Sequence, residues 1–120
     1  MVKAKRLTVF TLVLIVIMLA VGCGEKIPEG FTEDEYEKSK KVLSTINDFL
    51  DAEISGDDAV EKLDILSDQL HQSDNSTVSL IGTYASGARQ QIKYYTIQAN
   101  SSYMDEVIEY RDKIKELLEE

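Results

Sequence analysis

Apolar residues recur at intervals of three and four along most of this chain, from residue 36 to residue 118. This spacing gathers them on one side of an α-helix, and that side must be buried against neighbouring helices. No segment shows the apolar–polar alternation of a half-buried strand. The spacing therefore predicts an all-α fold.

The first helix is expected to begin at the capping box formed by Thr32 and Glu35. Phe31 precedes the cap and is spaced to pack on Tyr36 as a hydrophobic staple. Gly56 favours the end of this helix. Its expected apolar side comprises Tyr36, Val42, Leu43, Ile46, Phe49, Leu50 and Ile54.

The second helix is expected to be capped by Asp57 or Asp58, with Glu61 three residues after Asp58. Its apolar side follows helical spacing and is followed by a polar turn over residues 73–76. The residues of this side are Val60, Leu63, Leu66 and Leu70.

The C-terminal half contains either two helices or one. A third helix is expected from near Thr77, and residues 100–102 are poor helix formers, so Ser102 with Asp105 predicts a new cap. The apolar phase continues without a slip across this point, so one helix over 78–118 is the alternative. With a break near residue 100, the chain is expected to form a small four-helix bundle with helices of about 22, 15, 22 and 16 residues. Without the break, it would form three helices, the last of them long.

The N-terminus carries a basic segment followed by an apolar one. Lys3, Lys5 and Arg6 precede an almost entirely aliphatic run from residue 7 to residue 21, which closes with Gly22 and Cys23. A transmembrane helix needs about 20 apolar residues, whereas the run to Gly22 is about 16 residues long. The segment is therefore typical of an export signal.

Residues 19–23, Leu-Ala-Val-Gly-Cys, resemble the lipobox of bacterial prolipoproteins. The resemblance implies cleavage between Gly22 and Cys23, a diacylglyceryl thioether on Cys23, and anchoring on the extracytoplasmic face of a cell membrane, with the outer membrane as an option. The expected parts are a signal peptide (1–22), the lipidated cysteine with a short tether (23–31), and a helical domain (32–120). An uncleaved N-terminal anchor is the alternative and gives the same topology. No family resemblance is found for the helical domain.

The charge beyond Cys23 is strongly acidic, with 22 Asp and Glu against 10 Lys and Arg. Such a chain does not bind nucleic acid through phosphates, and anionic lipid repels it, so the lipid anchor must hold it at the membrane. We expect a cationic peptide, an envelope protein or a divalent metal as its partner.

Catalysis finds little support in the sequence, and neither enzymatic activity nor a cofactor is expected. His71 is the only histidine and lies near the end of the second helix, where it suits the helix dipole. The carboxylates of Asp57, Asp58 and Glu61 cluster at the first interhelix turn and are candidate ligands of a divalent cation, although they lack the pattern of an EF-hand.

Tyrosines suggest a binding face. Tyr84 and Tyr94 fall off the core spacing of the third helix, and exposed tyrosines are frequent interface anchors. Gly82 and Gly87 in the same helix indicate a close helix approach or a docking face. The sequence therefore predicts a membrane-anchored, non-catalytic adaptor for an envelope protein or peptide, or alternatively a lipoprotein that binds divalent cations or cationic peptides.

Overall fold

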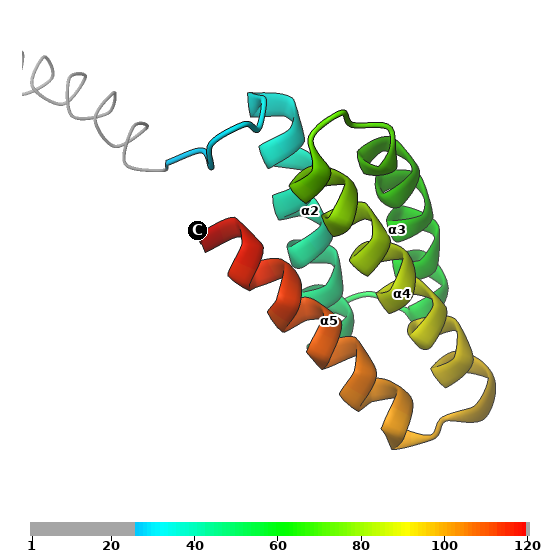
Figure 1. The fold of residues 1–120 in the computed structure, drawn as a ribbon. Helices are drawn as coiled ribbons and strands as arrows, with labels where there is room; N and C mark the ends of the chain where they lie inside the picture. The colour runs from blue at the N-terminus through cyan, green and yellow to red at the C-terminus, as the bar shows by residue number, and fades with distance from the viewer. Residues whose placement is uncertain (1–25, 120) are drawn as a thin grey trace, which may run out of the picture.

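The computed structural model describes residues 26–119, which contain four α-helices and no strand (Figure 1). The all-α prediction is confirmed, and so is the four-helix arrangement. The C-terminal half contains two helices, so the alternative with one long helix is wrong. The helices are α2 (Glu33–Leu50), α3 (Gly56–His71), α4 (Ser76–Gln98) and α5 (Ser101–Glu119).

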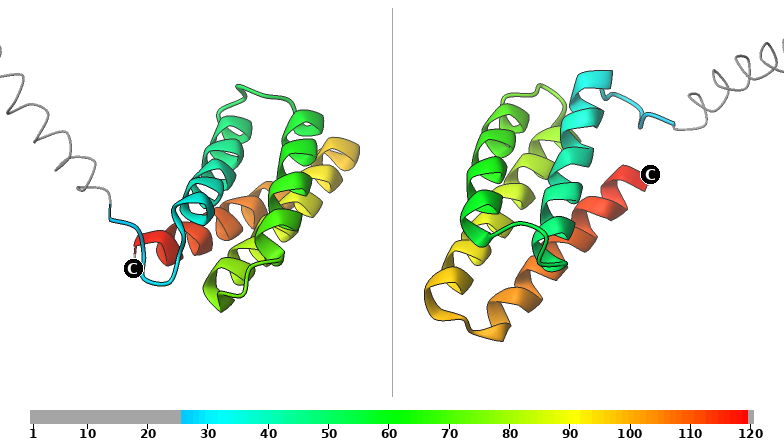
Figure 2. Two further views of the ribbon diagram at one scale, coloured as in Figure 1. Left: turned by 90° about the horizontal axis from the view of Figure 1, so that it is seen from above. Right: turned by 180° about the vertical axis from the view of Figure 1, so that it is seen from behind.

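Consecutive helices run antiparallel and form an up-and-down bundle (Figures 1 and 2). The α3–α4 pair shares the most extensive contact, and α4–α5 the next. α2 packs mainly on α3, so α2 and α5 meet along a looser seam. This seam is where the bundle is least closed.

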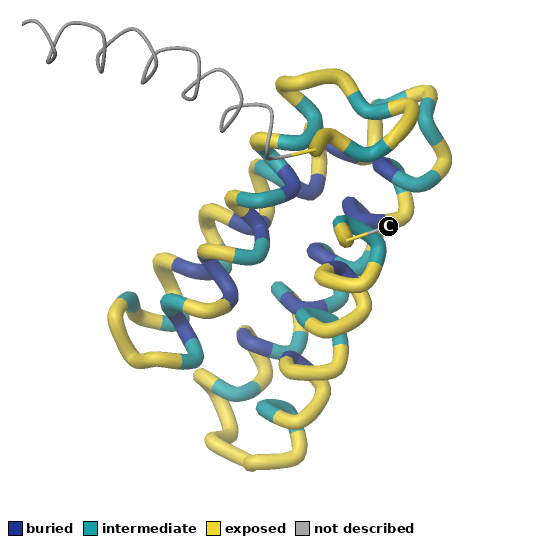
Figure 3. Tube along the Cα trace, turned by 90° about the vertical axis from the view of Figure 1, so that its left-hand side faces the viewer, coloured by how far each residue is buried: buried dark blue, intermediate teal, exposed yellow. Residues whose placement is uncertain are grey.

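The core lies between all four helices, and the buried residues face inward while the outer sides are exposed (Figure 3). On α2 the buried centre is Val42, Ile46 and Phe49, whereas Leu43 and Leu50 are only partly buried. The apolar side of α2 is therefore wider than its contact with the core. The largest fully buried apolar side chains are Ile46, Leu63, Leu70, Ile81, Ile92 and Ile114.

The predicted start of α2 is confirmed in detail. The Thr32 hydroxyl oxygen accepts a hydrogen bond from the Glu35 N–H, and the Glu35 carboxylate accepts one from the Thr32 N–H, both at 3.0 Å. The Phe31 and Tyr36 rings meet edge to face, with centroids 6.5 Å apart. Ser73, in the α3–α4 turn, donates to the second oxygen of Glu35 at 2.7 Å. Glu35 thus ties the beginning of α2 to a distant turn.

Replacing Ser73 by alanine is expected to reduce stability near neutral pH and to have less effect in acid. The hydrogen bond from Ser73, followed by that from the Thr32 backbone, lowers the pKa of Glu35 below its ordinary 4.5. A carboxylate with a lowered folded-state pKa stabilises the fold above its unfolded pKa, and this stabilisation is lost as pH falls through the folded value. The pair is partly exposed to solvent, so we expect a contribution of less than about 1 kcal/mol to the free energy of unfolding.

Urea unfolding of the wild type and of Ser73→Ala at several pH values between 7 and 3 measures this difference. The gap should narrow towards pH 3. In a Glu35→Gln background the serine substitution should show no pH-dependent effect, and a gap that stays constant down to pH 3 would contradict the assignment.

The α2–α3 connection differs from the predicted one. α2 ends at Leu50, and Gly56 is the first residue of α3 instead of the end of the preceding helix. Ala52 has a left-handed backbone (φ 62°), which turns the chain before Gly56 is reached. The cap of α3 is Ser55, whose hydroxyl oxygen accepts from the Asp58 N–H at 3.1 Å, so the prediction of an aspartate cap is wrong.

The break between α4 and α5 occurs where it was predicted, with a different cap. Ala99 ends α4 in the left-handed conformation (φ 52°), and its N–H donates to the Tyr95 carbonyl at 2.7 Å. The Asn100 side-chain oxygen accepts from the Ser102 N–H at 2.9 Å. Asn100, and not Ser102, therefore provides the side-chain cap.

The two glycines of α4 mark close helix approaches, which confirms one of the two expectations for them. A Cβ on Gly82 would lie 3.0 Å from the backbone nitrogen of His71 and 3.1 Å from the carbonyl oxygen of Ser67, both in α3. A Cβ on Gly87 would lie 2.6 Å from the Tyr110 ring of α5. Both faces are therefore occupied by helices of the same chain.

Candidate functional site

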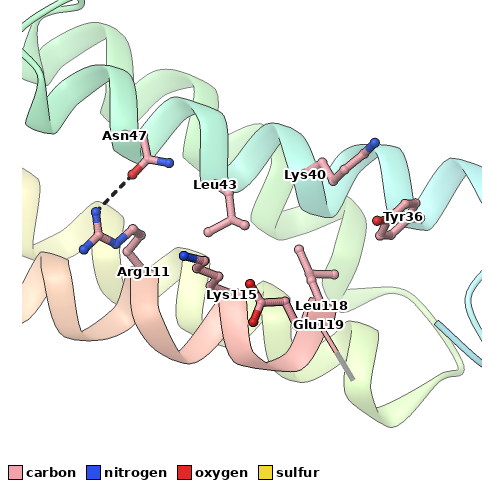
Figure 4. Close-up of a pocket in the computed structure, with 8 residues that line it drawn as sticks. All are labelled: Tyr36, Lys40, Leu43, Asn47, Arg111, Lys115, Leu118 and Glu119. Atoms are coloured by element: carbon pink, nitrogen blue, oxygen red, sulfur yellow. Dashed lines mark hydrogen bonds between the residues drawn. The ribbon is translucent and has the colours of Figure 1, made fainter. Parts of the chain in front are cut away.

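A groove of about 390 Å³ opens along the α2–α5 seam (Figure 4). It lies in the half of the bundle that contains the beginning of α2 and the end of α5. Helical spacing aligns its residues, since positions 36, 40, 43 and 47 share one side of α2. The lining residues are Tyr36, Lys40, Leu43 and Asn47 of α2, and Arg111, Lys115, Leu118 and Glu119 of α5.

Polar contacts hold one end of the groove. The Arg111 guanidinium donates to the Asn47 side-chain oxygen across the seam at 3.2 Å, and its Nε donates to Asp112 at 2.9 Å. At the other end, the Lys40 ammonium lies 4.7 Å from the centre of the Tyr36 ring, within cation–π range. The apolar surface between these ends comes from Leu43 and Leu118.

The groove is locally basic in a chain that is acidic as a whole. Among the lining residues between 26 and 119, Lys40, Arg111 and Lys115 lie beside one carboxylate, that of Glu119, and Arg111 is also paired with Asp112. Lys115 makes no ion pair or hydrogen bond with any other residue between 26 and 119. The net charge of the chain suggests cationic ligands, whereas this groove has the charge that suits an anion.

The two candidate anchor tyrosines both lean on α5 and lie apart from each other. Tyr84 packs against Tyr110 with ring centroids 6.1 Å apart and is only partly exposed. Tyr94 packs against Tyr103 at 5.5 Å, and its hydroxyl accepts from Gln90 at 2.7 Å. Tyr94 is the more accessible of the two candidates.

An apolar tip lies at the C-terminal end of α4, and we define it as Tyr94 and Ile97. Tyr94 is 36% exposed and Ile97 is 69% exposed, the highest value among the exposed large apolar residues between 26 and 119. The α4–α5 turn next to it is at the opposite end of the bundle from residues 26–31 (Figure 1). Helical spacing identified Tyr94 as a candidate anchor but did not identify Ile97, because Ile97 is recognised by its exposure in the fold and not by its helical phase.

The acidic residues proposed as metal ligands lie in and after the first turn of α3. The carboxylates of Asp57 and Asp58 lie in the first turn, where negative charge is favourable at a helix N-terminus. The Asp58 N–H donates to the Ser55 hydroxyl oxygen. Between residues 26 and 119, no group of three or more acidic, histidine or cysteine side chains is arranged to hold a metal ion. Asp57, Asp58 and Glu61 therefore form no such group in this fold.

His71 has a structural partner. Its Nε2 lies 2.9 Å from the Thr83 hydroxyl oxygen, which links the end of α3 to α4. This contact agrees with the structural role expected from its place at the end of a helix.

Gly22 and Cys23, the predicted cleavage and lipidation residues, lie outside the described residues. Within residues 26–119, none of the four helices is both long and apolar enough to cross a bilayer.

The basic groove was not predicted from the sequence. Lys40 and Asn47 sit at helical spacing beside Leu43, and Arg111 and Lys115 sit likewise beside Leu118, so each half is visible as a mixed face of one helix. Only the antiparallel pairing of α2 with α5 joins the halves.

Comparisons of the chain with protein-family models, with curated proteins and with solved structures find no match.

Proposed function

We propose that this chain is a lipid-anchored, non-catalytic adaptor of the bacterial cell envelope that holds a protein or peptide partner at its apolar tip. The observation that carries the proposal is the exposure of Ile97 and Tyr94 together at one end of the bundle. Tyrosine is enriched among interface anchors, and Ile97 adds exposed apolar surface to that of Tyr94.

The anchor and the tip would lie at opposite ends. Lipidation at Cys23 would attach the chain through residues 24–31, which span at most about 27 Å when fully extended. α4 has 23 residues and is therefore about 34 Å long. The apolar tip would thus face away from the membrane, where a partner can reach it.

The absence of catalysis in the proposal is supported by the positions of the reactive side chains. The imidazole of His71 is held by Thr83. Hydrogen bonds from Ser73 and Thr32 lower the pKa of Glu35, and these bonds belong to the α2 cap and the α3–α4 turn. A perturbed pKa often marks a catalytic group in a cleft, and Glu35 has a structural role instead.

A photocrosslinking amino acid at position 97 in living cells tests the proposal. We expect a discrete protein adduct from this position. We also expect Tyr94→Ala to reduce the yield of this adduct about tenfold, because loss of a binding hot spot costs at least about 1.4 kcal/mol of binding free energy.

Position 65 provides the matched control. Ile65 is 54% exposed on α3, and the same crosslinker there should not give the adduct. An identical adduct from positions 65 and 97, or none from position 97, would contradict a partner site at the tip.

A further inference from the structure

We propose that the α2–α5 groove is a binding site for a small anionic amphiphile, a carboxylate carried on a short hydrocarbon chain. This site is separate from the apolar tip, and the inference does not depend on the adaptor proposal. It rests on the volume of the groove, its apolar floor and its three cationic groups, all in one place (Figure 4).

The size and floor of the groove suit a small apolar body. Its volume of about 390 Å³ is at the lower end of the range of small-molecule sites, about 300–1,000 Å³. Leu43 and Leu118 face each other across the seam, and the Tyr36 ring lies at one end. A hydrocarbon chain laid along this floor would cover apolar surface that the four helices leave partly open.

The cations are placed to receive an acidic headgroup. The Lys115 ammonium has three donors and no partner among the other residues described. Arg111 uses one guanidinium N–H for Asn47 and its Nε for Asp112, which leaves further N–H groups for a ligand. A carboxylate beside these two side chains would receive charge-assisted hydrogen bonds, which are stronger than neutral ones.

The surroundings of the groove favour a free acid over a lipid held in a bilayer. Next to the groove, a second hollow of about 350 Å³ shares Leu118 and Glu119 with it and is also lined by Lys26 and Glu29. Glu29 and Glu119 outnumber Lys26 at this end, on the side of residues 26–29, and would disfavour contact with an anionic bilayer surface. A single acid would bind with its carboxylate at Arg111 and Lys115 without bringing such a surface up to these carboxylates.

Photoaffinity labelling of the full chain with a diazirine derivative of decanoate tests the site. We expect adducts on the peptides that contain residues 36–47 and 111–119, and we expect unlabelled decanoate to compete for them. Lys115→Glu should weaken the competition at least tenfold, because it removes a charge-assisted partner and introduces a like charge.

Lys113→Glu is the matched control, since it makes the same charge change on α5. The Lys113 ammonium lies over the Tyr84 and Tyr110 rings and does not line the groove. This variant should bind decanoate as the wild type does. Circular dichroism of both variants should show unchanged helix content, because both lysines are exposed to solvent.

Three results would overturn the inference. One is labelling confined to residues 1–25, which would show partition onto the apolar N-terminal run. Another is equal competition by decyltrimethylammonium, which would remove the role of the cations. The third is competition by phosphatidylglycerol vesicles with none by decanoate, which would assign the groove to bilayer lipid.

Discussion

Substitution of Gly82 by leucine is expected to lower the free energy of unfolding by about 3 kcal/mol or more. Gly82 is buried where α4 crosses α3, and even a Cβ would stand 3.0–3.1 Å from backbone atoms of His71 and Ser67. Backbone atoms of a packed helix cannot move aside singly, so a larger side chain must push α3 and α4 apart. This pair forms the most extensive contact in the bundle.

Thermal and urea unfolding followed by circular dichroism measure the effect. For a domain of this size, each kcal/mol lowers Tm by about 4–8 °C. Gly87→Leu is the comparison, because the nearest atoms there belong to the end of the partly buried Tyr110 side chain, which can rotate away. A loss at Gly82 no greater than at Gly87 would show that the α3–α4 contact is not limited by backbone approach.

Substitution of Cys23 by alanine is expected to block maturation to the lipid-anchored form. The thioether requires the cysteine sulfur, and two acyl chains hold a protein stably because each buried CH₂ contributes about 0.8 kcal/mol. Within residues 26–119 there is no helix that could span a membrane in their place. We expect the variant to accumulate as an unprocessed precursor that incorporates no labelled palmitate, measured by gel mobility and metabolic labelling.

Cys23→Ser provides a near-isosteric control that should behave in the same way, because a hydroxyl does not replace the thiol in this modification. A variant that still reached the size of the processed form and remained in the membrane fraction would contradict the lipid-anchor proposal. That result would leave the crosslinking test at the apolar tip unaffected, so the two halves of the proposed function fail separately.

Local sequence signals were sufficient for the type and order of the helices, and they favoured the observed number over the three-helix alternative. The capping box of Thr32 and Glu35 forms as predicted, and so does the contact between Phe31 and Tyr36. These features depend on residues within a few positions of one another, so the sequence contains all of the interacting groups. The same holds for the break near residue 100, where poor helix formers outweighed a continuous apolar phase.

Helix ends were less predictable where two local signals compete. Gly56 has the residue type of a helix end but begins α3, because Ser55 supplies a cap and Ala52 has already reversed the chain. Gly56 has a packing reason that no local pattern reveals. A Cβ there would lie 2.2 Å from the Thr96 methyl group of α4.

The candidate sites depended on tertiary structure. Tyr84 and Tyr94 were identified by helical phase, but only the packing of the helices shows that Tyr84 is partly buried against Tyr110 and that Tyr94 and Ile97 remain exposed. The net charge of the chain likewise suggested cationic ligands. It did not indicate the basic groove, because a sum over the chain contains no information on where charges gather.

The basic groove is the clearest example. Periodicity along the chain determines which side of a helix is apolar, since that requires only the spacing of its own residues. It does not determine which helix becomes its neighbour. Lys40 and Lys115 are 75 positions apart in sequence, and they line one groove because α2 and α5 pack antiparallel along a loose seam. That pairing results from how all four apolar sides are buried together, so it arises only in the folded bundle.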